Sequence, residues 1–305
     1  QSLWRVRLSL FLNTLRFNWG LFVRTKIGLI GLVIIAFYFL LALAHPILIN
    51  TVWSPGTYDP VAGFGFDEPR HPAPPSLSHP LGTDPIGRDV LSQLMWSTRS
   101  EFMLGVVAAL VTVSVGTIVG AAAAYFGGVI DALLMRLADI TIMTPILSLL
   151  IVISGFFEVS LVHLALIIGL VAGFGSTGVV LKSQALTIKV KPYVEAAKAA
   201  GGGPFYIIFV HIIPNLMPLS FFYMMFTVTS AIFAEATLSY LGLLDIPMSW
   251  GIMIHTTQTS GYLLQITSAW WIIFPVSLSI TLLSASFYLV GRALDEIVNP
   301  RLRRS

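Results

Sequence analysis

The sequence predicts an all-α integral membrane protein with six transmembrane helices. Hydrophobic residues make up 56% of the 305 residues and charged residues only 10%, whereas a soluble domain carries about 25% charged residues. The mean hydropathy is +0.87. Several uncharged runs reach the ~20 residues that a helix needs to cross a ~30 Å hydrocarbon core. This composition excludes a soluble enzyme, a nucleic-acid-binding module and a disordered chain, and the absence of cysteine excludes disulfides and thiolate sites.

Six apolar runs give the predicted spans. They cover residues 27–49, 102–130, 140–157 and 159–181, a stretch within 204–234, and residues 268–291. The third run is expected to begin earlier, near Asp131, so that it includes Arg136 and Asp139. Charged residues inside a span are costly and are usually functional or paired. Arg136 and Asp139 are therefore either a local ion pair or part of a gate.

Basic residues predict the orientation of these spans. Residues 1–26 hold five Lys or Arg, residues 182–203 hold four and residues 292–305 hold four, together 13 of the 17. Six spans place all three segments on one side, so the positive-inside rule predicts that both termini are cytoplasmic. Residues 1–26 mix Leu, Phe and Trp with Arg, which predicts a cytoplasmic amphipathic arm. Residues 27–49 are predicted to be the first transmembrane helix, and residues 297–305 are expected to be a basic cytoplasmic tail.

Two long stretches are expected on the opposite side. Residues 50–101 are rich in Pro and Gly and are predicted to form an extracytoplasmic loop with a short helix. Thr83-Asp84-Pro85 resembles a helix start, because Thr or Asp suits the N-cap and Pro suits the first helical position. Residues 236–267 form the second outer stretch. Glu235, at the outer end of span five, is a candidate gate or cargo-facing group, or else a carboxylate that reaches the interface.

The segment between spans four and five predicts a short helix over residues 192–200. Pro192 suits a first helical position, and Gly201-Gly202-Gly203 supplies a helix stop. One face carries small side chains and one aromatic ring at helical spacing, from Tyr193, Ala196, Ala197 and Ala200. Such a face is suited to a groove on another protein. A solvated loop helix is the alternative, and the residues alone leave both open.

Three other patterns do not indicate a site. Residues 173–178 match G-x-G-x-x-G, but they lie inside an apolar span with no preceding strand, so close packing of membrane helices is the better interpretation. The sequence contains no Walker A motif. The six His residues are dispersed, and no metal site is predicted.

Several segments resemble the permease subunits of ABC importers, in the dipeptide, oligopeptide and nickel branch. The resemblance rests on the EAA signature and on the stretch before span two. These are Glu195-Ala196-Ala197 with Gly201, His211-Ile212-Ile213-Pro214-Asn215, and the twelve residues from His79 to Val90. Further matches are at residues 25–32, 125–139, 234–242 and 249–251, so the resemblance covers nearly the whole chain.

The resemblance implies a type I ABC importer permease-like fold. Residues 102–296 would form the five-helix permease core, including a coupling helix at 192–203 that docks on an ATPase subunit. The coupling residues would be Pro192, Tyr193, Glu195, Ala196, Ala197, Ala200 and Gly201, and His211, Pro214 and Asn215 would support the join between loop and span.

The implied partners are a homologous second permease, two ABC ATPase subunits, an extracytoplasmic substrate-binding protein and membrane lipid. ATP and magnesium would be bound by the ATPases, so this chain would have no cofactor, no metal and no enzyme activity. Asp84, Arg88 and Asp89 are expected either at the edge of the binding-protein contact or only in bracing their own helix. The expected cargo is a dipeptide or oligopeptide, with oligosaccharides or nickel as alternatives. A stand-alone secondary transporter or channel is the alternative class.

Overall fold

The computed structural model describes residues 19–265 and 267–298. Within these ranges the chain is helical and contains no strand. In order the helices are α2 (Lys26–Thr51), α3 (Pro55–Tyr58), α4 (Val90–Phe126), α5 (Gly128–Met143), α6 (Ile146–Phe156), α7 (Leu161–Ala172), η1 (Gly173–Thr177), α8 (Gly178–Lys189), α9 (Pro192–Ala199), α10 (Pro204–Tyr206), η2 (Ile207–Ile212), α11 (Ile213–Tyr240), α12 (Trp250–Thr259) and α13 (Trp270–Val298).

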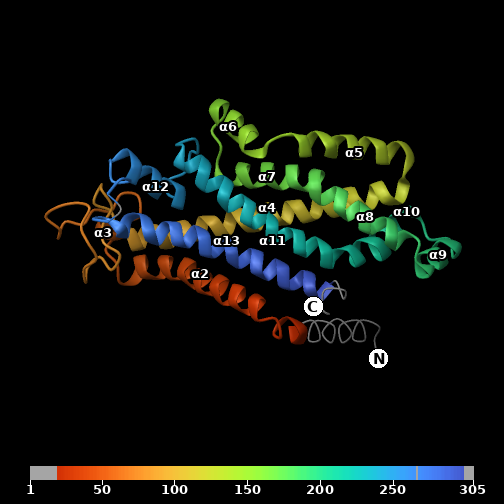
Figure 1. The fold of residues 1–305 in the computed structure, drawn as a ribbon, viewed down its shortest axis with the longest axis horizontal. Helices are drawn as coiled ribbons and strands as arrows, with labels where there is room; N and C mark the ends of the chain where they lie inside the picture. The colour runs from red at the N-terminus through yellow and green to blue at the C-terminus, as the bar shows by residue number, and fades with distance from the viewer. Residues whose placement is uncertain (1–18, 266, 299–305) are drawn as a thin grey trace.

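The helices form an elongated bundle with two different ends (Figure 1). Helices α3 and α12 and the long segment between α2 and α4 lie at one end, which we call the loop end. Helix α9 lies at the opposite end, together with the beginning of α2 and the end of α13; we call this the α9 end. Most of the predicted arm and tail (residues 1–18 and 299–305) falls outside the described residues.

Five of the described helix runs are long and apolar enough to cross a membrane, and α5 with α6 gives a sixth if that bent pair counts as one span. The axes of α5 and α6 differ by 82°. The bend lies at Thr144 and Pro145, which are both extended. Proline cannot donate to the helix ladder and disfavours the α conformation in the residue before it. The third predicted span, expected to begin near Asp131, therefore corresponds to the bent pair α5 and α6 and not to one continuous helix.

Helix α4 begins later than the Thr83-Asp84-Pro85 pattern predicts. The Asp84 side chain accepts hydrogen bonds at 2.9 Å from the backbone N–H groups of Ile86 and Arg88, and Gly87 has a φ of +93°, so these residues form a turn. Asp89 is the N-cap instead, because its carboxylate accepts from the Ser92 N–H at 2.6 Å. The short helix within residues 50–89 is α3, which begins at a proline.

Helix α4 lies at the centre of the bundle and packs on α2, α7, α8 and α11. Small residues allow these close approaches. A Cβ added to Gly120 would lie 2.7 Å from the backbone nitrogen of Lys182, and one added to Gly169 would lie 2.6 Å from Cβ of Val111. Gly173 packs in the same way on Val115. The interpretation of residues 173–178 as a close-packing segment is confirmed at Gly173 and Gly178, where an added Cβ would lie 2.8 Å from a neighbouring atom.

Candidate functional site

Helix α9 is defined by local sequence at both ends. Pro192 occupies the first turn, where its missing N–H is not needed. The helix ends in a Schellman motif, in which the N–H of Gly202 donates to Ala197 O at 3.0 Å and the N–H of Gly201 to Lys198 O at 2.9 Å. Gly201 has a φ of +87°, a conformation that side-chain-bearing residues rarely adopt. The predicted helix boundaries are correct to within one residue.

A single apolar side chain anchors α9 to the bundle. Val194 is fully buried and joins a cluster of side chains from α4, α8, η2 and α11. The other members of this cluster, which we call the α9 cluster, are Ala121, Ala124, Leu181, Ala185, Ile188, Ile207, Ile208, Ile212 and Leu216. Burial of one such side chain contributes about 1.5–3 kcal/mol. The sequence pattern did not single out Val194, because a single branched aliphatic residue in the eight-residue helix gives no periodicity.

The opposite face of α9 is open. The exposed residues are Pro192, Tyr193, Glu195, Ala196, Ala199 and Ala200. Glu195 makes no ion pair or hydrogen bond within the described part of the chain. Ala197 differs from the prediction, because it is half-buried and packs against the α9 cluster. The reason is geometric: residue 197 follows the Val194 anchor by three positions and therefore lies partly on the same side of the helix.

Polar contacts tie α9 and α8 to neighbouring helices. The Lys198 ammonium lies 5.3 Å from the ring centroid of Tyr125, at the end of α4. Lys189 donates at 2.9 Å to the carbonyl oxygens of Ala124 and Tyr125, where a cation is favoured by the helix dipole. Lys182 pairs with Asp131 of α5 at 2.5 Å. Sequence reasoning missed these contacts, since each joins residues more than fifty positions apart.

The predicted support residues lie where the chain returns from α9 to the bundle. His211 is in η2, and its ring centroid is 6.1 Å from that of Tyr193 and 5.4 Å from that of Tyr206. The Asn215 amide donates to the His211 carbonyl at 2.7 Å. Pro214 lies in the first turn of α11. His211 therefore contacts α9 directly, while Pro214 and Asn215 shape the beginning of α11.

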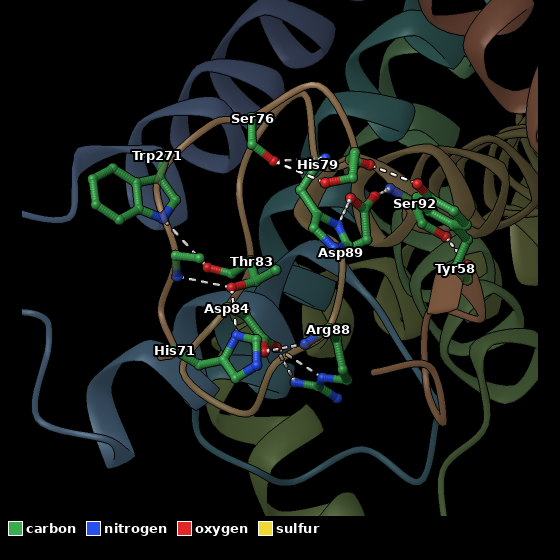
Figure 2. Close-up of polar contacts among 12 residues, drawn as sticks. Tyr58, His71, Ser76, His79, Thr83, Asp84, Arg88, Asp89, Ser92 and Trp271 are labelled. Atoms are coloured by element: carbon green, nitrogen blue, oxygen red, sulfur yellow. Dashed lines mark hydrogen bonds and ion pairs between the residues drawn. The ribbon is translucent and has the colours of Figure 1, made fainter. Parts of the chain in front are cut away.

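A second polar cluster lies at the loop end (Figure 2). Asp84 and Arg88 form a buried ion pair at 2.7 Å, and the Gln93 amide donates to the same carboxylate at 2.9 Å. Arg88 also reaches the Thr256 hydroxyl of α12 at 3.4 Å, and the Trp271 indole of α13 donates to the carbonyl of Thr83 at 3.3 Å. These bonds join the turn before α4 to two helices that are more than 160 residues away in sequence.

Asp89 is part of an adjoining buried pair. Its carboxylate lies 2.8 Å from His79 Nδ1, and both side chains are fully buried. Burial raises the pKa of the Asp89 carboxyl, and the hydrogen bonds from His79 and Ser92 oppose part of that shift. Ser92 in turn donates its hydroxyl proton to the Tyr58 carbonyl. The pair fastens α3 and the outer segment to the first turn of α4.

The charged groups of this cluster are buried in the chain. Asp84 is 5% exposed, Arg88 9% and Asp89 0%; Asp84 faces Arg88, and Asp89 faces His79. This burial favours the interpretation that these residues brace the loop end over the interpretation that they contact a binding protein. The exposed positions of this segment include large apolar side chains, among them Phe66, Leu77 and Ile86, together with the charged residues Asp67 and Arg70.

The charged residues expected within spans differ in their surroundings. Arg136 and Asp139 on α5 are 3.5 Å apart, with 83% and 51% of their side chains exposed. Glu235 is fully buried in α11, where it accepts a hydrogen bond from Ser239 at 2.5 Å. Glu101 of α4 is also buried. The packing of α4 against α11 covers Glu235 in this chain, which is unfavourable to the alternative that its carboxylate reaches the interface.

These features define a multi-pass helical membrane protein with a braced loop end and a short exposed helix at the other end. Comparison with known proteins identifies its family. The chain belongs to the binding-protein-dependent transport system inner membrane component family, whose model matches residues 114–304. It is a transport permease, and the family predicted from the motifs is confirmed.

Curated relatives match almost the whole chain. It is 33% identical over 288 residues to a dipeptide transport system permease protein, DppC, of Bacillus subtilis, covering 94% of this chain and 85% of the relative. It is 31% identical to the oligopeptide transport system permease protein OppC of the same organism, with 93% and 88% covered. A probable D,D-dipeptide transport system permease protein of Escherichia coli is 29% identical, with 83% and 84% covered.

Proposed function

We propose that this chain is the permease subunit of an ATP-driven importer of dipeptides or oligopeptides, and that α9 is its coupling helix. It would line the pathway with a homologous permease, engage two ATPase subunits, and receive cargo from an extracytoplasmic binding protein. ATP and magnesium would be bound by the ATPases. The observation that carries the proposal is α9 itself, which is anchored by Val194 and presents Tyr193, Glu195 and Ala196 outward.

Three observations support a docking role for α9. A helix of eight residues is too short to be stable alone in water, so its position depends on the α9 cluster and on Gly201. Its open face combines one aromatic ring, one carboxylate and several alanines, which suits insertion into a groove. Its contacts run to α4, α8 and η2, so a force applied to α9 would reach several spans. Coupling of this kind requires two discrete arrangements of packed elements.

Peptide cargo is inferred from the relatives, which are named as dipeptide and oligopeptide permeases. Oligosaccharides and nickel are alternatives within the same type of machine. A stand-alone transporter is the alternative class. Purification of the chain from its native membrane separates the classes, because an importer permease copurifies with ATPase subunits and a stand-alone transporter does not.

The coupling role is tested by placing a large side chain on the exposed face of α9. Ala196→Trp is preferable to Ala197→Trp, since residue 197 also contacts the chain's own cluster. In the reconstituted complex, Ala196→Trp should reduce uptake at least tenfold and weaken copurification of the ATPases. Glu195→Ala should reduce both by a smaller factor through loss of a charge-assisted contact. Ala62→Trp, at an exposed alanine of the loop end, is the matched control and should transport normally.

Near-normal uptake in both Ala196→Trp and Glu195→Ala would overturn the assignment of α9 as the coupling helix. Loss of uptake in Ala62→Trp to the same extent would show that bulk alone is harmful. Thermal stability of each purified variant is measured alongside, so that unfolding is not mistaken for uncoupling.

The orientation is tested by thiol labelling, which the absence of cysteine makes simple. The exposed positions Leu77 and Ser260 lie at the loop end, and Ala199 is exposed on α9. Single cysteines at residues 77 and 260 should react with an impermeant reagent in intact cells. A cysteine at residue 199 should react only after permeabilisation. The reverse pattern would contradict cytoplasmic termini and a cytoplasmic α9.

A further inference from the structure

A cavity of about 370 Å³ lies between the α7–η1–α8 run and α11. Its lining comes from two parts of the chain, Ile168, Ala172, Ser176 and Thr177 on one side and Phe222, Tyr223, Phe226, Thr227 and Ser230 on the other. Ser176 and Ser230 are exposed, so the cavity opens on the surface of this chain. Its volume falls within the ~300–1,000 Å³ typical of small-molecule sites.

The position of the cavity is at mid-depth in the bundle. The α7–η1–α8 run extends from residue 161 to residue 189, and the lining residues 172–177 lie at its centre. The lining residues of α11 likewise lie in the central part of the run 204–240. Both walls are therefore far from the loop end and from the α9 end, where a lipid headgroup would lie.

The helix is broken at the wall of this cavity. Residues 173–177 form a π-helical turn, and Gly175 has a ψ of −123°, outside the helical region. Irregular backbone at membrane depth is tolerated where it is buried in protein or lines a water-filled cavity. Breaks of this kind form substrate sites in other transport folds, and π-helical turns are frequent at functional sites. Ser176 and Thr177 belong both to the break and to the cavity lining.

The residues that line the cavity are uncharged. None of the lining residues carries a charge, five bear hydroxyl groups, and three of the nine are aromatic. Hydroxyls both donate and accept hydrogen bonds, and those of Ser176 and Ser230 have no partner within the described residues. Neutral donors and acceptors between aromatic surfaces match the amide groups and varied side chains of a peptide. A metal ion would need carboxylate or imidazole ligands, which these walls lack.

We propose that this cavity is the permease's contact site for the peptide in transit, with the hydroxyls of Ser176, Tyr223 and Ser230 facing the peptide main chain. The inference rests on the proposed import of peptides and adds where the cargo lies within this chain. Because hydroxyls would contact the amide groups that all peptides share, such a site would accept peptides of different sequence.

The test uses the complete complex in liposomes and a charged methanethiosulfonate reagent. Single cysteines at residues 176 and 230 should react, since a water-filled cavity permits ionisation of the thiol. Ala285→Cys is the matched control: this residue is exposed near the middle of α13 but outside the cavity, and its thiol should not react. Dipeptide, loaded binding protein and ATP together should slow labelling at residue 176 at least threefold.

A large side chain placed in the cavity provides a second test, with peptide uptake as the measurement. Ser176→Trp should lower peptide uptake at least tenfold while ATPase subunits still copurify, and Ala285→Trp should leave uptake unchanged. Suppose that the unmodified complex imports peptide. Normal uptake in Ser176→Trp, or a cysteine at residue 176 that is as unreactive as the one at residue 285, would then overturn the cavity as the contact site and leave the proposed function standing. Failure of the unmodified complex to import any peptide would overturn both.

Discussion

The two ends of the molecule handle polar groups in opposite ways. At the loop end the charges of Asp84, Arg88 and Asp89 are buried and satisfied by one another or by His79. At the α9 end Glu195 is exposed and unpaired within the described residues, and one valine anchors the helix. A polar group buried with its partners is costly to disturb, whereas an exposed one remains available to another protein. The comparison indicates a rigid loop end and supports the docking role proposed for α9.

The largest expected effect is at the loop end. Asp84→Ala leaves the buried Arg88 without its partner, and breaking a buried pair costs about 3–5 kcal/mol. Asp84→Asn should cost less, because its side-chain oxygen can still accept from the backbone of the turn. Thermal unfolding in detergent measures both variants. Asp67→Ala, at an exposed acid of the same segment, is the control and should change the unfolding free energy within about ±0.5 kcal/mol. Equal stability of Asp84→Ala and Asp67→Ala would remove the bracing role.

An intermediate effect is expected at the glycines after α9. Gly201→Ala places a side chain at a φ of +87°, which costs about 1–2 kcal/mol and should loosen the end of α9. Gly203→Ala is the matched control, because Gly203 has a φ of −71° and open space around its Cβ position. Hydrogen exchange across residues 192–203 should accelerate in Gly201→Ala only. Identical exchange in the two variants would show that the Schellman motif does not hold α9 in place.

The smallest effect is expected on α5. The Arg136–Asp139 pair is largely exposed in this chain, and such pairs contribute about 0–1 kcal/mol. Arg136→Gln and Asp139→Asn should therefore leave stability and uptake near normal if the pair is only local. A several-fold loss of uptake at unchanged stability would contradict that interpretation and assign the pair to a gate or to contact with the second permease.

Local sequence determined several features of this protein without tertiary information. The number of apolar runs, the boundaries of α9 and the turn at Gly201 follow from hydropathy, from Pro192 at the first turn and from a glycine at the stop. Each depends on residues within about one turn of one another, where capping and periodicity act. The resemblance to importer permeases was also present in short motifs, and the match of residues 114–304 to the family confirms it.

The tertiary structure alone decided which groups meet. The turn at residues 84–88 is local, but its contacts with α12 and α13, from Arg88 to Thr256 and from Trp271 to Thr83, come from the tertiary structure. Glu235 is covered by α4, Ala197 is turned partly inward by the Val194 anchor, and residues 172–177 form a cavity only with α11. The physical reason is that burial and partner choice depend on segments far apart in the chain, whereas caps and hydropathy depend on neighbours alone.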